Sequence, residues 1–106
     1  MSLDVMLYVD GECVFDANIT HNLGRMAEAA GIYKHLWRPE EIGATKASDI
    51  ADAVALGAKD MAVRPSYYKQ FDSENGWGLY ENFLPWVGRY AEALAEYPDA
   101  TIEISR

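Results

Sequence analysis

Residues 3–17, LDVMLYVDGECVFDA, open with alternating side chains that suit an extended chain with one apolar face. The members on that face are Leu3, Val5, Leu7 and Val9. This period of two is typical of a strand that buries one side. Asp10-Gly11 is a dipeptide favoured in the tight turn between antiparallel strands. The stretch therefore predicts a β-hairpin with strands over residues 3–9 and 12–17.

A second alternating stretch, residues 101–105, sets Ile102 and Ile104 between polar neighbours and predicts a final strand. The hairpin and this strand each have an apolar face to cover, so we expect them in one sheet. The predicted fold class is α+β. It has a small, mainly antiparallel sheet, formed by the N-terminal hairpin and the C-terminal strand, with three main helices and short helical turns layered on one face. Residues 1–106 are expected to form a single domain, and residues 1–3 resemble a start that cloning can add.

Three stretches between the strands have apolar residues at helical spacing. The expected helices run from Thr20 to Gly31, from about Ser48 to Arg64, and from Leu79 to Glu96. Thr20 suits the N-cap and Gly31 the C-terminal stop of the first helix. Pro85 predicts a kink or a restart in the third helix, and shorter turns are expected after Pro39 and Pro65. The predicted inner face of the third helix consists of Tyr80, Phe83, Leu84, Val87, Ala91 and Leu94.

The 106-residue chain has a formal net charge of −8, with carboxylates dispersed among Lys and Arg. Such a surface repels phosphate backbones and anionic lipid. Cys13 is the single cysteine and cannot close an intrachain disulfide, which favours a reducing compartment. The longest apolar runs are far short of the roughly 18 residues that span a bilayer. We therefore expect a soluble domain in the cytoplasm, with no nucleic-acid partner and no membrane insertion.

The stretch Asn18-Ile19-Thr20-His21-Asn22-Leu23 gathers hydrogen-bonding side chains where a strand passes into a helix. Free backbone N–H groups point outward at such a junction, which is a geometry that can hold an anion. The alternative is that Asn18 and Thr20 only cap the helix and that His21 is a surface residue. We favour this structural interpretation, because the glycines that let a backbone wrap a phosphate are missing.

Two tryptophans stand in predicted connections. The loop NGWG places Trp77 between two glycines. An exposed Trp77 would contact a partner or a planar ligand, whereas a buried one would plug the helix layer, and we favour the plug. Arg38, next to Trp37, has the chemistry to clamp a carboxylate or stack on an aromatic ring, but pairing with Glu40 or Glu41 is the default expectation.

Conventional catalytic and metal-binding sets are missing from the sequence. Cys13 falls in a predicted strand and is expected to be an inert buried thiol. His21 and His35 lie on different predicted elements, without a partner at metal-ligand spacing. We expect no metal and no cofactor. The catalytic candidate is His21 as a general base, with Asn18, Asn22 or Arg38 as orienting groups.

Several short strings occur together along the chain. They are ITHNL (19–23), Met26-Ala27, AGIY (30–33), LWRPEE (36–41), NGWG-x-Y (75–80), PDA-x-I (98–102) and Ser105-Arg106. In combination they resemble a family of small uncharacterised bacterial and phage proteins, and the resemblance covers nearly the whole chain. It implies a bacterial or phage origin, but no activity, ligand or catalytic residue.

The favoured function is a non-catalytic domain that binds a small polar molecule or another protein, because aromatic and amide side chains abound in predicted loops while a catalytic set is lacking. One alternative is a small enzyme that uses His21 as general base. Another is a homo-oligomer whose tryptophans and tyrosines form the interface. The candidate binding residues are Asn18, Thr20, His21, Asn22, Trp37, Arg38, Asn75, Trp77 and Tyr80. Residues 20–22, 37–38 and 75–77 are expected on one side of the fold.

The charge makes a testable prediction about partners. With a net charge of −8 and no local basic patch, the protein should not bind DNA or RNA specifically. Fluorescence anisotropy with labelled duplex and single-stranded probes should show no saturable complex near physiological salt. Tight, salt-sensitive binding to either probe would contradict this prediction.

Overall fold

A computed structural model describes residues 2–106, and its elements follow the predicted order. The strands are β1 (Ser2–Val9), β2 (Glu12–Thr20) and β3 (Thr101–Ser105). The helices are α1 (Gly24–Ala29), α2 (Tyr33–Trp37), α3 (Ala47–Val63), α4 (Pro65–Lys69) and α5 (Tyr80–Glu96), with the 3₁₀ turns η1 (His21–Leu23) and η2 (Pro39–Ile42). The α+β prediction is confirmed.

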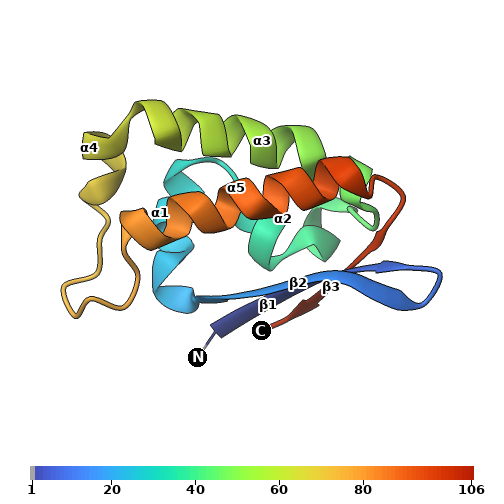
Figure 1. The fold of residues 1–106 in the computed structure, drawn as a ribbon. Coiled ribbons are helices and arrows are strands. Elements are labelled where there is room, and N and C mark those ends of the chain that lie inside the picture. The colour runs from blue at the N-terminus through green and yellow to red at the C-terminus, as the bar shows by residue number, and fades with distance from the viewer. Residues whose placement is uncertain (1) are drawn as a thin grey trace.

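The sheet is antiparallel, and β1 lies at its centre in the order β2-β1-β3. Its inward side chains, Leu3, Val5 and Leu7, are fully buried. The neighbouring strands add their own apolar residues to the same face, as where Leu7 pairs with Phe15 on β2 and with Ile102 on β3. Figure 1 shows the helices together on this side of the sheet, as the α+β pattern predicted.

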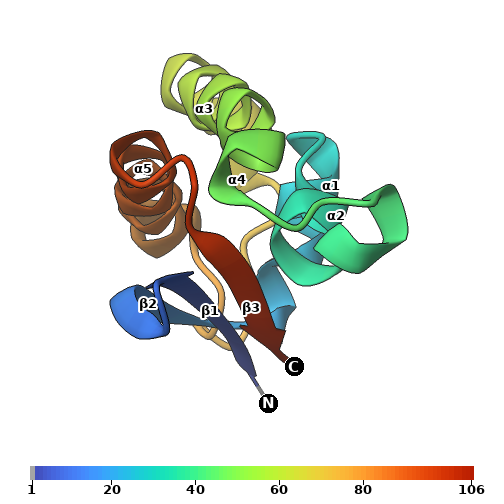
Figure 2. The ribbon, with the colours of Figure 1, turned by 90° about the vertical axis from the view of Figure 1, so that its right-hand side faces the viewer.

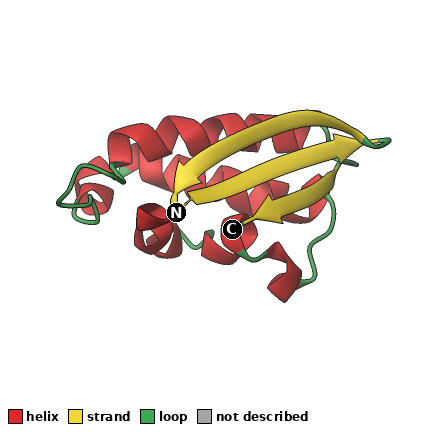
Figure 3. Ribbon diagram, turned by 90° about the horizontal axis from the view of Figure 1, so that it is seen from below, coloured by secondary structure: helices red, strands yellow, loops and turns green. Residues whose placement is uncertain are grey.

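The opposite face of the sheet is open, and Figure 3 looks onto it. Cys13 is exposed on this face, so the expectation of a buried thiol was wrong. The cause is a β-bulge, because Leu7 pairs with Phe15 while the next residue, Tyr8, pairs with Cys13, which leaves Val14 as the extra residue. The extra residue makes the side chains between the bulge and the hairpin turn point to the opposite face of the sheet. Cys13 is therefore on the outer face and not the inner one.

The two long helices, α3 and α5, pack against each other, and α1 and α2 fill the rest of the layer, as the end-on view in Figure 2 shows. The inner face of α5 differs from the prediction, because Trp86 and Tyr90 are buried while Leu84 and Ala91 are only half-buried. The ring of Tyr90 stacks on Phe15 of β2 with centroids 5.8 Å apart, so contact with the sheet decides which side of the helix turns inward.

Helix ends follow the local signals. Gly31 has a φ of 77°, and the N–H of the next residue, Ile32, donates to the carbonyl of Ala27 at 3.0 Å, which closes α1. The chain then enters α2 directly, a helix that the sequence did not indicate. Pro85 lies inside α5, yet the helix runs unbroken from Tyr80 to Glu96, so the restart predicted there does not occur.

None of the helices within residues 2–106 has both the length and the apolar character needed to cross a bilayer.

Deleting residues 101–106 should abolish cooperative unfolding. The deletion removes the strand that pairs with β1 from Asp4 to Tyr8, and it uncovers one side of the central strand. Urea denaturation followed by circular dichroism is the measurement. Glu103→Ala is the matched control, because Glu103 is exposed on the same strand, and its unfolding free energy should change by no more than about 0.5 kcal/mol. A truncated chain with the full-length transition would contradict the prediction.

Candidate functional site

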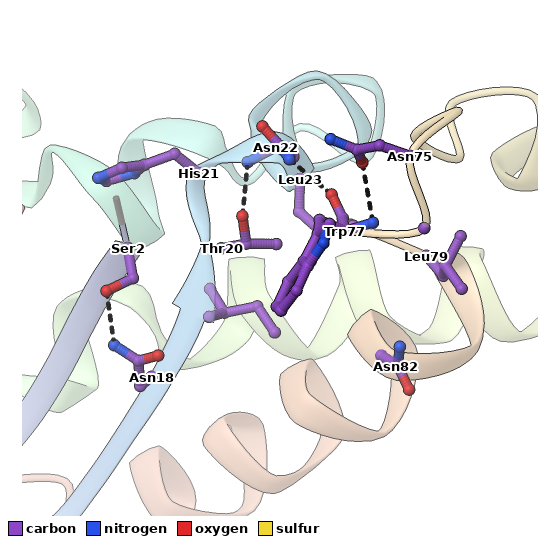
Figure 4. Close-up of a pocket in the computed structure, with 13 residues that line it drawn as sticks. Ser2, Asn18, Thr20, His21, Asn22, Leu23, Asn75, Trp77, Leu79 and Asn82 are labelled. Atoms are coloured by element: carbon purple, nitrogen blue, oxygen red, sulfur yellow. Dashed lines mark hydrogen bonds between the residues drawn. The ribbon is translucent and has the colours of Figure 1, made fainter.

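A pocket of about 790 Å³ lies where β2 ends and the loop before α5 comes back to meet it (Figure 4). It is lined by six of the nine candidate binding residues: Asn18, Thr20, His21, Asn22, Asn75 and Trp77. Asn82 on α5 and Ser2 on β1 complete its polar wall. The structure therefore brings together two segments that the sequence separates by about half the chain.

The strand side of the pocket is fixed by a helix cap. The hydroxyl of Thr20 accepts a hydrogen bond from the N–H of Asn22 at 3.3 Å, and the fully buried Leu23 anchors the 3₁₀ turn that follows. On β2, the amide of Asn18 donates to Ser2 Oγ at 2.9 Å and to Asp4 Oδ1 at 2.7 Å. Capping by Thr20, which we favoured from the sequence, thus occurs on a residue that also lines the pocket. Asn18, expected to cap as well, instead pairs with side chains of β1.

The loop side of the pocket is tied to this turn by Asn22. Its Nδ2 donates to the carbonyl of Trp77 at 2.7 Å. Gly78, with a φ of 122°, lies so close that a Cβ added to it would stand 2.9 Å from the Cβ of Asn22. Within the loop, Asn75 Oδ1 accepts from the N–H of Trp77 at 2.9 Å and from the hydroxyl of Ser73 at 2.5 Å. These contacts hold the loop backbone in one shape.

The side chain of Trp77 is 71% exposed although its backbone is held on both sides. The plug interpretation was therefore wrong. The N–H and carbonyl of Trp77 are both used in hydrogen bonds to asparagine side chains, Asn75 and Asn22, and this backbone setting directs the indole away from the core. Figure 4 shows the indole between Thr20 and Asn82, inside the pocket rather than under the helices.

The imidazole of His21 is fixed by a hydrogen bond from the buried side chain of Trp37. The indole N–H of Trp37 donates to His21 Nδ1 at 2.8 Å. An indole nitrogen can only donate, so Nδ1 must be the acceptor and the ring proton lies on Nε2. Trp37 is itself buried, it stacks on Tyr33 with centroids 5.3 Å apart, and its carbonyl accepts a 2.6 Å hydrogen bond from Arg106. The imidazole is thereby fixed as the tautomer that donates through Nε2.

This tautomer bears on the catalytic alternative. A general base needs a free lone pair that can take a proton. In His21 the lone pair on Nδ1 already accepts from Trp37, and Nε2 carries the proton. The imidazole is therefore arranged to donate a hydrogen bond rather than to remove a proton.

Three candidate residues lie outside the pocket lining. Trp37 supports His21 from the protein side, as described above. Arg38 pairs with Glu41 at 3.3 Å, which was the default expectation. Tyr80 is buried, and its hydroxyl donates to the carbonyl of Met61 at 2.6 Å, so it fastens α5 to α3.

Two residues with polar side chains in the lining, Ser2 and Asn82, were not among the candidates from the sequence. Ser2 stands beside the pocket because it pairs with Thr20 across the hairpin, and the bulge in β2 sets this pairing, whereas the register expected from the turn alone would place Ser2 opposite Ile19. Asn82 lies in the first turn of α5, and no local signal distinguishes it from other exposed helix residues.

Another polar cluster joins α3 to α4 away from the pocket. Asp60 accepts hydrogen bonds from Arg64 and from the hydroxyl of Tyr68. Burial, followed by the hydrogen bond to Asp60, raises the pKa of Tyr68 to about 12. The bonds of Arg64 and Tyr68 lower the pKa of Asp60. Within the described part of the chain, no three His, Cys, Asp or Glu residues gather as a metal site.

The chain matches no protein-family model, no curated protein and no solved structure. The resemblance to a family of small uncharacterised bacterial and phage proteins therefore stays a prediction.

Gly78→Ala should destabilise the protein by about 1–3 kcal/mol, because the new methyl group would meet Asn22 and the backbone is left-handed there. Gly88→Ala is the matched control. A Cβ at Gly88, inside α5, meets nothing within 4 Å, so this change should stabilise by about 0.5–1 kcal/mol through helix propensity. Unfolding free energies from urea titration measure both effects. Equal midpoints for Gly78→Ala and the parent protein would refute the close contact of loop and turn.

Proposed function

We propose that the protein is a non-catalytic binding domain whose pocket takes a small uncharged polar molecule. The observation that carries the proposal is Trp77, an indole 71% exposed within a polar pocket on a backbone held by side-chain hydrogen bonds. A rigid aromatic anchor loses little conformational entropy when a ligand covers it. The pocket volume, about 790 Å³, lies in the range of small-molecule sites.

The lining argues for an uncharged ligand. Although the chain has a net charge of −8, none of the lining residues that the structure describes is Asp, Glu, Lys or Arg. A charged ligand would lose water on entering and would find no opposite charge to replace it. Amide, hydroxyl and imidazole groups instead offer neutral hydrogen bonds, and the half-buried Ile19 and Leu79 add apolar surface.

The state of His21 supports binding over catalysis. Its Nε2–H is a donor with a fixed direction, since Trp37 holds the other ring nitrogen. Such a group can orient a ligand oxygen, and it lacks the free lone pair of a general base. The enzyme alternative is therefore the weaker one.

Trp77→Ala should abolish ligand binding and leave folding intact. The exposed indole contributes little to the core, so the unfolding free energy should change by about 0.5 kcal/mol or less. A thermal-shift screen with a library of uncharged metabolites would identify ligands of the parent protein, and isothermal titration calorimetry would compare the two proteins.

Leu56→Ala is the matched control, because Leu56 is 67% exposed on α3 and is not part of the pocket lining. It should bind every ligand as the parent does. Ligands that bind Trp77→Ala and the parent protein equally, or a library in which no compound raises the melting temperature, would overturn the proposed function.

A further inference from the structure

We infer that the ligand is an uncharged saccharide with one sugar ring stacked on Trp77, an inference that rests on the proposed binding function. The indole presents a flat face of negative electrostatic potential. The C–H groups on a face of a pyranose ring are polarised positively by the adjacent oxygens, so they are attracted to that face. Stacking would also cover the apolar surface of Trp77 that water now touches.

The surroundings of Trp77 favour a sugar over a planar heterocycle. A nucleobase is held best between two flat surfaces. Among the described lining residues, Trp77 carries the only fused ring system. Figure 4 shows Thr20 on one side of the indole and Asn82 on the other, with His21 farther from the ring, next to Ser2. A ligand on the indole thus meets one aromatic plane, and hydroxyl and amide groups, with the apolar side chains of Ile19 and Leu79, line the rest of the pocket.

The hydrogen-bonding groups left to a ligand are mixed in kind. Asn75 uses its Oδ1 within the loop, which leaves its Nδ2 as a donor. Asn18 uses both N–H groups of its Nδ2 and Asn22 uses one, which leaves their Oδ1 atoms as acceptors and one N–H of Asn22 as a further donor. His21 adds a donor through Nε2. An anion would require donors alone and a cation acceptors alone, whereas a hydroxyl group both donates and accepts. A polyhydroxylated ligand therefore matches the set.

The size of the pocket indicates more than one sugar ring. Its volume of about 790 Å³ is near the upper end of small-molecule sites. Polar residues stand at both ends, with Ser2 and His21 on one side of Trp77 and Asn82 on the other (Figure 4). A disaccharide or trisaccharide would reach both ends, with one ring on the indole and the next beside the end of β2.

The test is titration of the full chain with three sets of compounds, followed by calorimetry and by two-dimensional NMR of the ¹⁵N-labelled protein. The first set holds neutral disaccharides: maltose, cellobiose, lactose and N,N′-diacetylchitobiose. The second holds adenosine and guanosine, and the third glucuronate and glucose 6-phosphate. We expect saturable binding of at least one disaccharide, with shifts of the Trp77 indole N–H and the Asn82 amide resonances.

Variants locate the binding. Trp77→Ala should weaken the disaccharide by tenfold or more, which corresponds to about 1.4 kcal/mol. Trp77→Phe should retain part of the affinity, because it keeps an aromatic face, and Asn82→Ala should weaken binding several-fold at the other wall. Leu56→Ala should leave the affinity unchanged. Thermal unfolding of each variant would show that it is folded.

Three results would overturn the inference, and each is distinguishable from failure of the binding function itself. Binding of a nucleoside in the pocket without any disaccharide would refute the saccharide and leave the proposed function standing. Binding of the charged sugars as tightly as the neutral ones, with Trp77→Ala unaffected, would refute stacking and place the ligand elsewhere. Failure of the whole panel overturns the saccharide, while the wider library of uncharged metabolites decides on the proposed function separately.

Discussion

The rest of the structure depends on the burial of one face of β1. This strand is paired on both sides, and Leu3, Val5 and Leu7 are fully buried beneath the helices. Because the helices lie on that single face, each must direct its apolar stripe to the same layer. The chain therefore leaves the sheet at the end of β2 and turns at once into the helix layer. The pocket forms at this corner, where polar backbone groups cannot be paired by the sheet.

The corner is stabilised by contacts between segments far apart in the sequence. Asn22 binds the backbone of Trp77, 55 residues later, and Gly78 permits the two segments to touch. Behind His21, Trp37 connects the site to Arg106 at the end of β3. The pocket walls therefore belong to the same framework of contacts as the sheet.

Sequence patterns predicted the features that depend on neighbours along the chain. Alternation, the turn dipeptide and the stop at Gly31 were sufficient for the α+β class and for most elements. Cys13 was misplaced because the bulge depends on pairing between strands. Trp77 was misjudged because its direction depends on a backbone hydrogen bond to Asn22, which is distant in the sequence, as well as on the local bond to Asn75. The two polar segments of the pocket, residues 18–23 and 75–78, were recognisable from their composition. Asn82 became part of the site only through the tertiary fold.

The bulge in β2 exposes a cysteine thiol that can be labelled selectively. Cys13 is the single cysteine, it is exposed, and it pairs with Tyr8 near the hairpin turn, at the opposite end of β2 from the pocket. A maleimide dye, a nitroxide or a biotin can be attached there without first removing another thiol. Coupled through Cys13 to a sensor surface, every molecule would be tethered by the same end, with its pocket turned toward the solution.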